Sequence, residues 1–201
     1  MALLGSGGNG IADRALDEPR NAKTVVDLCG YTMNLILQER LFRSYPLFYR
    51  KAGDELSECP IDCWGIEVAD GWFELLDRLS AKLELAITDL VAGGLPLDEC
   101  PRAAQIKQKF GQLQVHIDYM DKLPNSIDSD LSLAEQVANE TCEKCGKPGT
   151  VRRTNWIHVA CDQCEQRRLE GADNGHVSKT ELDHHFRALT ALLENRSKGG
   201  Q

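Results

Sequence analysis

The chain has 201 residues, of which 42% are hydrophobic and 27% are charged, and its formal net charge is −8. This size suits one large domain or a core domain with a small metal-stabilised one, and the composition is that of a globular protein. No apolar run reaches the roughly 18 residues needed to cross a bilayer, and the N-terminus lacks the pattern of a signal peptide. We therefore expect a cytoplasmic protein with no membrane partner.

The acidic charge is unevenly distributed along the sequence. Residues 1–135 contain 13 Lys and Arg against 22 Asp and Glu, a net of −9, whereas residues 136–201 contain 10 against 9, a net of +1. Because a negative body repels phosphate backbones, these sums disfavour sequence-independent binding of nucleic acid by the whole protein.

The first part of the chain predicts a leader and one helix. Residues 1–22 are expected to be a flexible leader. Their Gly-x-Gly-x-x-Gly pattern matches a dinucleotide-binding fingerprint, but it follows no strand and opens no helix, so the glycines are interpreted as part of a flexible segment. Apolar residues at helical spacing predict a helix over residues 24–43. The aromatic segment 44–49, broken by Pro46, is expected to be a loop that packs on the core.

The central part mixes helices with short strands. Residues 64–68 predict a short strand, and residues 70–92 predict a long helix with Asp70 as its N-cap and Gly93 and Gly94 at its end. Residues 103–110 predict a short helix that Gly111 ends. Residues 113–119 alternate as a half-buried strand, residues 121–130 are expected to be a polar linker, and residues 132–139 a short helix.

Four cysteines have the spacing of a zinc ribbon. Cys142 and Cys145 form one Cys-x2-Cys pair, Cys161 and Cys164 form a second, and fifteen residues separate the pairs. Zn²⁺ takes four thiolates in a tetrahedron, and two such pairs supply them. We predict one structural Zn²⁺ per chain, with a small hairpin over residues 150–160 between the pairs.

Several residues near these cysteines carry further expectations. Trp156 is expected to shield the zinc site from water, and His158 lies close enough in sequence to replace a ligand, although four sulfurs already complete the tetrahedron. A basic patch is a candidate contact for a partner or a nucleic acid, although a solvated, partly salt-bridged face is the favoured interpretation; its arginines are Arg152, Arg153, Arg167 and Arg168.

The remaining cysteines and histidines are expected to be structural. Cys59, Cys63 and Cys100, with His116, could make a second metal site, but their spacing lacks a matching second pair, so packed or surface thiols are favoured. His116 falls on the polar face of its strand. Ser178 and Glu181 form a capping box that predicts a C-terminal amphipathic helix. His184 and His185 in this helix point about 100° apart, which favours surface placement.

The elements together predict an α+β fold, with a mainly helical core, a small sheet, a four-cysteine zinc-ribbon module and a C-terminal helix. The expected divisions are a leader at 1–22, an acidic core domain at 23–135, the ribbon module at 136–171, and the C-terminal helix and tail at 172–201.

The segments 64–67, 70–79 and 105–113, followed by the paired Cys-x2-Cys motifs, resemble a group of uncharacterised proteins of bacteriophages and bacterial genomes. The resemblance covers residues 60–165, and this chain has Gln112 where the group usually has a second glycine after Phe-Gly. It implies a phage or prophage setting, in which accessory proteins act by binding host machinery.

Three classes of function follow from these observations. The leading hypothesis is a non-enzymatic protein that binds a host or phage protein, for example one with a basic nucleic-acid groove; an inhibitor of a bacterial defence system, such as an anti-CRISPR, is one form. The alternative is a nucleic-acid-associated factor that uses the arginines around the ribbon. An enzyme is the third class, and no known catalytic motif is present in the sequence.

Overall fold

The computed structural model describes residues 32–52 and 59–171 of the chain. The described α-helices are α2 (Leu35–Ser44), α3 (Pro60–Trp64), α4 (Phe73–Ala92), α5 (Ser126–Asn139) and α6 (Asp162–Leu169). Three short 3-10 helices are η1 (Asp70–Trp72), η2 (Leu97–Glu99) and η3 (Met120–Lys122). The strands are β1 (Ile66–Glu67), β2 (Arg102–Lys109), β3 (Gln112–Asp118), β4 (Thr150–Arg153) and β5 (Ile157–Ala160). The predicted α+β class is confirmed.

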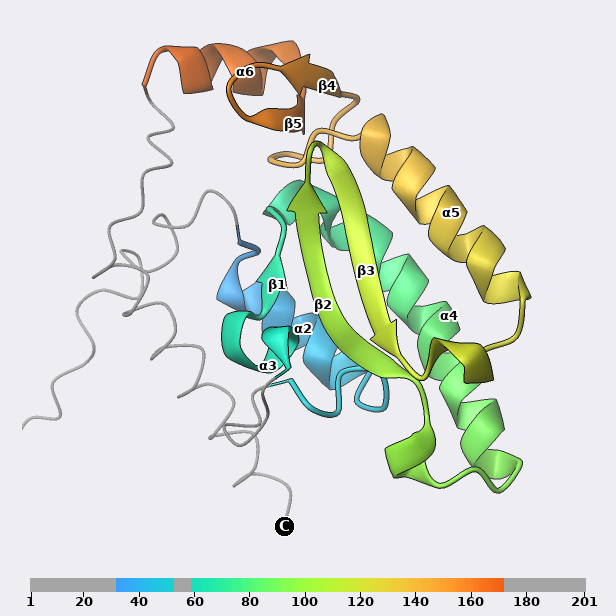
Figure 1. Ribbon diagram of the computed structural model, residues 1–201. Helices are drawn as coiled ribbons and strands as arrows, with labels where there is room; N and C mark the ends of the chain where they lie inside the picture. The colour runs from blue at the N-terminus through green and yellow to red at the C-terminus, as the bar shows by residue number, and fades with distance from the viewer. Residues whose placement is uncertain (1–31, 53–58, 172–201) are drawn as a thin grey trace, which may run out of the picture.

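The strands form two separate sheets. One is a three-stranded sheet in the order β1-β2-β3, in which β1 runs parallel to β2 and β3 runs antiparallel to it. The other is the antiparallel hairpin of β4 and β5. Helix α4 crosses one face of the larger sheet with α5 beside it, and the small hairpin and α6 lie together at one end (Figure 1).

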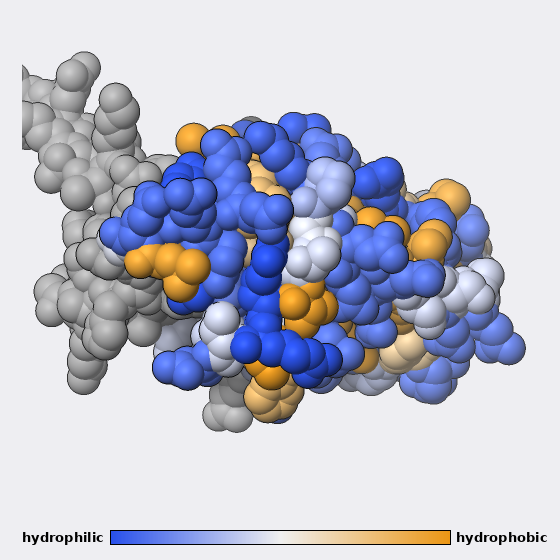
Figure 2. Space-filling model, turned by 90° about the horizontal axis from the view of Figure 1, so that it is seen from above, coloured by the Kyte–Doolittle hydropathy of each residue, from blue (hydrophilic) through white to orange (hydrophobic). Residues whose placement is uncertain are grey.

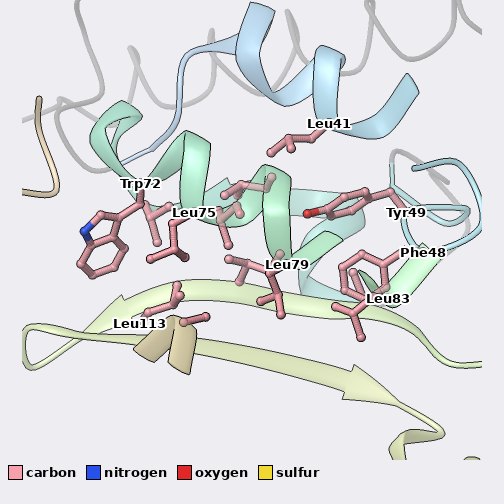
Figure 3. Packing of buried hydrophobic residues seen from close by; sticks show 14 of the residues in the cluster. Leu41, Phe48, Tyr49, Trp72, Leu75, Leu79, Leu83 and Leu113 are labelled. Carbon is pink, nitrogen blue, oxygen red and sulfur yellow. The ribbon is translucent and has the colours of Figure 1, made fainter. Parts of the chain in front are cut away.

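The hydrophobic core lies between α4 and the larger sheet. Leu76, Leu83 and Ile87 recur along α4 at helical spacing and are fully buried. Figure 3 shows how Leu79, Leu83 and the side chains around them point from α4 toward the strand that carries Leu113. Phe48 and Tyr49, in the segment after α2, also pack into this core, as predicted for the aromatic loop. The Tyr49 hydroxyl shares a hydrogen bond with the Ser80 hydroxyl (2.8 Å between oxygens).

The prediction of a helix over residues 103–110 is wrong, because this segment is β2, the central strand of the larger sheet. Its Ala, Gln and Lys residues favour a helix locally. Tertiary pairing on both edges overrides that preference, since Ile106 pairs with Ile66 on one side and with Val115 on the other. The burial of Ile106 against the core then fixes the register of the strand.

The helix predicted over residues 24–43 is confirmed from Leu35 onward as α2, and residues 24–31 lie outside the described residues. Residues 32–34 are not helical, and the Asn34 side chain accepts a hydrogen bond from the N–H of Ile36 (2.8 Å) as the N-cap of α2. Asp70 does not cap α4, which is also a correction. Its carboxylate instead accepts from the backbone N–H of Asn34 (2.6 Å) and so ties the start of α2 to η1.

The expected linker at 121–130 is also partly wrong. Helix α5 begins at Ser126, six residues before the predicted start, because Ile127 and Ala134 already face the core. Strand β1 is shorter than predicted, since Trp64 ends α3. The strand at 113–119, the hairpin at 150–160 and the end of α4 at Gly93 are confirmed. The leader, Cys29, the C-terminal helix with its capping box, and His184 and His185 lie outside the described residues.

Candidate metal centre

The four predicted ligands converge at one point. Each of Cys142, Cys145, Cys161 and Cys164 has its sulfur within 4.8 Å of the other three, and the Cys145 and Cys161 sulfurs are 3.7 Å apart. A tetrahedron with metal–sulfur bonds of about 2.3 Å has sulfur–sulfur edges of roughly 3.8 Å. The donor set therefore fits a tetrahedral metal ion, and these four thiols can hold one.

The first cysteine pair lies in a tight turn that follows α5. The backbone N–H of Cys142 donates to the carbonyl of Lys147 (2.7 Å), and the N–H of Gly146 donates to the carbonyl of Cys142 (2.9 Å). Gly146 adopts a φ of 72°, a left-handed conformation that favours glycine. This turn holds the two sulfurs on one side of the centre.

The second pair spans the junction between β5 and α6. Cys161 is the N-cap of α6, and its sulfur accepts a hydrogen bond from the N–H of Cys164 (3.4 Å). That N–H lowers the pKa of Cys161 to about 7, whereas burial raises the pKa of Cys164 to about 12 and also raises that of Cys145. The Arg167 guanidinium donates to the Cys164 sulfur (3.0 Å). A bound cation would supply the charge that the buried thiols need to ionise.

The first cysteine turn is docked onto η1 of the core. The N–H of Gly71 donates to the carbonyl of Glu143 (2.7 Å), and the Trp72 indole N–H donates to the carbonyl of Thr141 (2.8 Å). A Cβ added at Gly71 would lie 2.5 Å from the backbone nitrogen of Gly146 and 2.6 Å from the carbonyl oxygen of Glu143. Only glycine allows this approach, so the Asp-Gly-Trp sequence is the docking site of the metal-binding turn.

A buried carboxyl group lies beside this docking contact. Glu143 accepts a hydrogen bond at its side chain from the N–H of Ala69 (3.2 Å), and its own N–H donates to the carbonyl of Val159 (3.0 Å). Burial raises the pKa of Glu143 to about 7. Val159 belongs to the same hydrophobic cluster as α4. The ribbon thus completes the core of the protein and is joined to it through backbone contacts.

The sequence expectation for Trp156 fails, whereas His158 stays outside the donor set, in line with four sulfurs completing the tetrahedron. Trp156 does not shield the thiols, because it lies in the β4–β5 turn with 52% of its surface exposed. His158 is not a ligand; its Nε2 contacts the Glu165 carboxylate (2.8 Å) and its Nδ1 contacts the Trp156 carbonyl (2.9 Å). Arg168, followed by His158, lowers the pKa of Glu165 to about 2.

The buried tryptophan beside the centre is instead Trp72, whose side chain points away from the cluster around Leu79 in Figure 3. Sequence reasoning assigned it to the core but missed its contact with the ribbon. Gly71, which precedes this tryptophan, could have indicated the contact. Glycine disfavours helix formation, so its presence at the start of a long helix suggests that another part of the backbone approaches closely there.

The four arginines named as candidate contacts do not form one free patch. Arg152 pairs with Asp162 (2.5 Å), Arg167 contacts the Cys164 sulfur, and Arg168 pairs with Glu165 (2.8 Å). Arg153 lies exposed on β4. Most of the basic charge around the ribbon therefore serves the ribbon itself.

The second metal site that the sequence left open is not formed by the described side chains. The Cys59 sulfur contacts the carbonyl of Ala104 (3.1 Å), and Cys100 is buried in the core near Leu95. His116 is exposed on β3, as expected. The side chain of Cys63 lies outside the described ones. Among residues 32–52 and 59–171, the four ribbon cysteines are the cluster whose donor atoms come close enough to hold a metal.

None of the described helices has the length and apolar character that crossing a membrane requires. Protein-family models, curated proteins and solved structures were each compared with the chain, and none of them matches it.

Proposed function

We propose that the four cysteines hold one structural Zn²⁺. A set of four thiolates is typical of zinc, and it leaves no open position at which water or a substrate could bind. The role is structural because the metal-binding turn supports the core through Gly71 and Trp72.

Elemental analysis of the purified protein tests this assignment. We expect about one zinc per chain, and the double variant Cys142→Ser with Cys161→Ser should lose it. Cobalt substitution should give the absorption of a tetrahedral tetrathiolate. A full equivalent of zinc in the double variant, or a metal-bound water in the cobalt form, would contradict the proposal.

We further propose that the protein is not an enzyme and acts by binding a protein partner through α5. The observation that carries this proposal is the composition of α5, which contains Asp128, Asp130 and Glu135 but no Lys or Arg. On the same helix Leu133 is 53% exposed and Val137 is 38% exposed. Asp130 is paired with Lys82 of α4, so Asp128 and Glu135 carry the remaining acidic charge of this helix. An exposed apolar pair on such a helix suits a partner with a basic, partly apolar surface.

A hollow between α4 and α5 adjoins this pair and gives a partner side chain a place to insert. Its volume is about 170 Å³ and its lining is mainly apolar, formed by Leu75, Arg78, Leu79, Lys82, Asp130, Leu133, Ala134 and Val137. Lys82 and Asp130 pair with each other across it. Interfaces take most of their energy from a few such buried anchors.

The phage resemblance gives this proposal its setting. The partner would be a host or phage protein, and an inhibitor of a bacterial defence system, such as an anti-CRISPR, would need just such a surface to occupy a basic nucleic-acid groove. Acidic charge would also speed that encounter.

Cross-linking in bacterial cells, followed by titration with the purified partner, tests the proposal. The variant Leu133→Ser with Val137→Ser should weaken binding by about tenfold or more, because truncated interface anchors commonly cost 2 kcal/mol or more. Leu85→Ser is the matched control, since Leu85 is an exposed leucine on α4 outside the hollow. Equal binding by the double variant and the control would refute the α5 surface.

A further inference from the structure

Positive charge is concentrated in two segments, one in the β2–β3 hairpin and the other in the first cysteine turn with the β4–β5 hairpin that follows it. Residues 102–117 contain three Lys or Arg and residues 144–161 contain four, while neither segment contains an Asp or Glu. Because the whole chain carries −8, the residues outside these two segments carry −15. Two segments far apart in the sequence thus share a charge opposite to that of the rest of the protein.

The fold places these two segments against each other. The Gln108 side chain donates to the carbonyl of Ile157 (2.6 Å), which joins β2 to β5. A Cβ added at Gly111 in the β2–β3 turn would lie 3.1 Å from the Ile157 side chain and 3.5 Å from that of Val151. The tip of one hairpin therefore packs on the side of the other, and the two form one continuous surface. Figure 2 looks down on this end of the molecule and shows apolar atoms set among hydrophilic ones.

Aromatic side chains stand exposed on this two-hairpin surface. Phe110 is 69% exposed and Trp156 is 52% exposed, and they adjoin Gly111 and Ile157, the residues at which the hairpins meet. Val151, 38% exposed, lies beside Gly111 at the same junction.

Phe110 also adopts a strained backbone conformation. Its φ is 55° and that of Gly111 is 79°, the pattern of a type I′ turn, in which the first position favours Asn or Gly. A phenylalanine there costs about 1 kcal/mol or more in backbone strain and exposes an apolar ring to water. Stability alone does not account for the residue, which points to a role in binding.

Part of the basic charge remains on the open surface. Arg102 pairs with Asp118 (2.9 Å) and Arg152 with Asp162 (2.5 Å), so those two cations are neutralised within the fold. Lys109 lies over the Phe110 ring, with its ammonium 5.6 Å from the ring centre. Arg153 is exposed on β4. Glu67 of β1, another acid on the larger sheet, accepts a hydrogen bond from the Gln105 side chain (2.8 Å).

We propose that the two-hairpin surface binds single-stranded nucleic acid, with bases stacked on Phe110 and Trp156 and phosphates at Lys109 and Arg153. Exposed rings beside cations are the elements that bind single strands without sequence preference. Duplex nucleic acid fits this surface less well, because its bases are already stacked and leave no free face for the two rings. An acidic protein could pair with the cations, but it has no bases to stack on the rings. The inference goes beyond the binding of a protein partner by α5 and does not depend on it.

The test rests on a substitution that separates binding from folding. Phe110→Asn removes the ring but places at this position a residue that suits the turn, so it should raise Tm by about 3 °C while it weakens binding to a fluorescent dT15 or U15 oligonucleotide. Because stacking is worth about 1–3 kcal/mol per base, we expect at least a fivefold loss of affinity in 50 mM salt. Trp156→Ala should show a similar loss. Leu85→Asn is the matched control and should bind normally.

The ionic part is tested by salt dependence. Lys109→Gln with Arg153→Gln should flatten the slope of log affinity against log salt by about 1.4, because each phosphate contact to a single strand contributes about 0.7. Unchanged affinity in Phe110→Asn and Trp156→Ala would overturn the proposal. Binding of duplex DNA or polyglutamate as tight as that of the oligonucleotides would overturn it as well, since this would indicate a general attraction of polyanions or an acidic protein partner.

Discussion

Gly71→Ala is the sharpest test of how the metal-binding turn is joined to the core. The new Cβ would lie within 2.6 Å of backbone atoms of Glu143 and Gly146, and these atoms cannot move aside easily because the turn is held by its own backbone hydrogen bonds. The turn would have to separate from η1, which breaks the hydrogen bonds from Gly71 to Glu143 and from Trp72 to Thr141. Two lost bonds at about 1 kcal/mol each, with about 2 kcal/mol of overpacking, give a loss of about 4 kcal/mol in the free energy of unfolding.

Urea denaturation of the zinc-loaded protein, followed by tryptophan fluorescence, measures this loss. The matched control is Gly93→Ala at the end of α4, where an added Cβ would lie 3.3 Å from two carbonyl oxygens of the same helix, so we expect a change of less than about 1 kcal/mol. Zinc content should stay near one equivalent in both variants. If Gly71→Ala unfolded with the wild-type midpoint and slope, the inferred role of this contact would be wrong.

Two further predictions concern side chains of the core. Arg50 donates hydrogen bonds to the carbonyls of Leu47, Pro101 and Cys100. The variant Arg50→Lys keeps the charge but loses the planar guanidinium, so it should lower the free energy of unfolding by about 2 kcal/mol in thermal or urea melts. Wild-type stability in this variant would show that these three hydrogen bonds do not stabilise the fold. Burial raises the pKa of Tyr49 far above its usual value of 10.0, so the unfolded tyrosine ionises first and stability should fall as pH rises above about 10. Tyr49→Phe should lack that part of the alkaline loss in urea melts between pH 8 and 11, and an identical pH dependence in both proteins would contradict the assignment.

The cluster of four cysteines and the long helix were the parts that the sequence alone predicted well. Their signals are local: the cysteine spacing depends on two tight turns, and the apolar spacing of α4 repeats over five turns. Strand β2 could not be recognised in the same way, because Ile106 owes its strand conformation to partners about 40 residues earlier and 9 residues later in the chain.

Charge sums over long stretches of sequence missed one feature for a related reason. Summing charges over residues 1–135 hides the basic segment 102–117 inside an acidic total, and only the fold brings it beside residues 144–161. The start of α5 was recoverable, since Ile127, Leu131, Ala134 and Ala138 recur at helical spacing. The contact between Gly71 and the cysteine turn was not, because a glycine in the sequence does not reveal which segment will approach it.

The same contact has a consequence for synthesis of the protein. Residues 71 and 72 are made about 70 residues before the turn that docks on them, and the core also needs Val159 of β5. At about 5–20 residues per second, a growing chain waits several seconds with α4 translated but its apolar face incompletely covered. Contacts of such long sequence separation slow folding and expose the nascent chain to aggregation. A chain cut short before the second cysteine pair should therefore be recovered as insoluble protein, and the supply of metal late in translation would decide how much of the full chain becomes native.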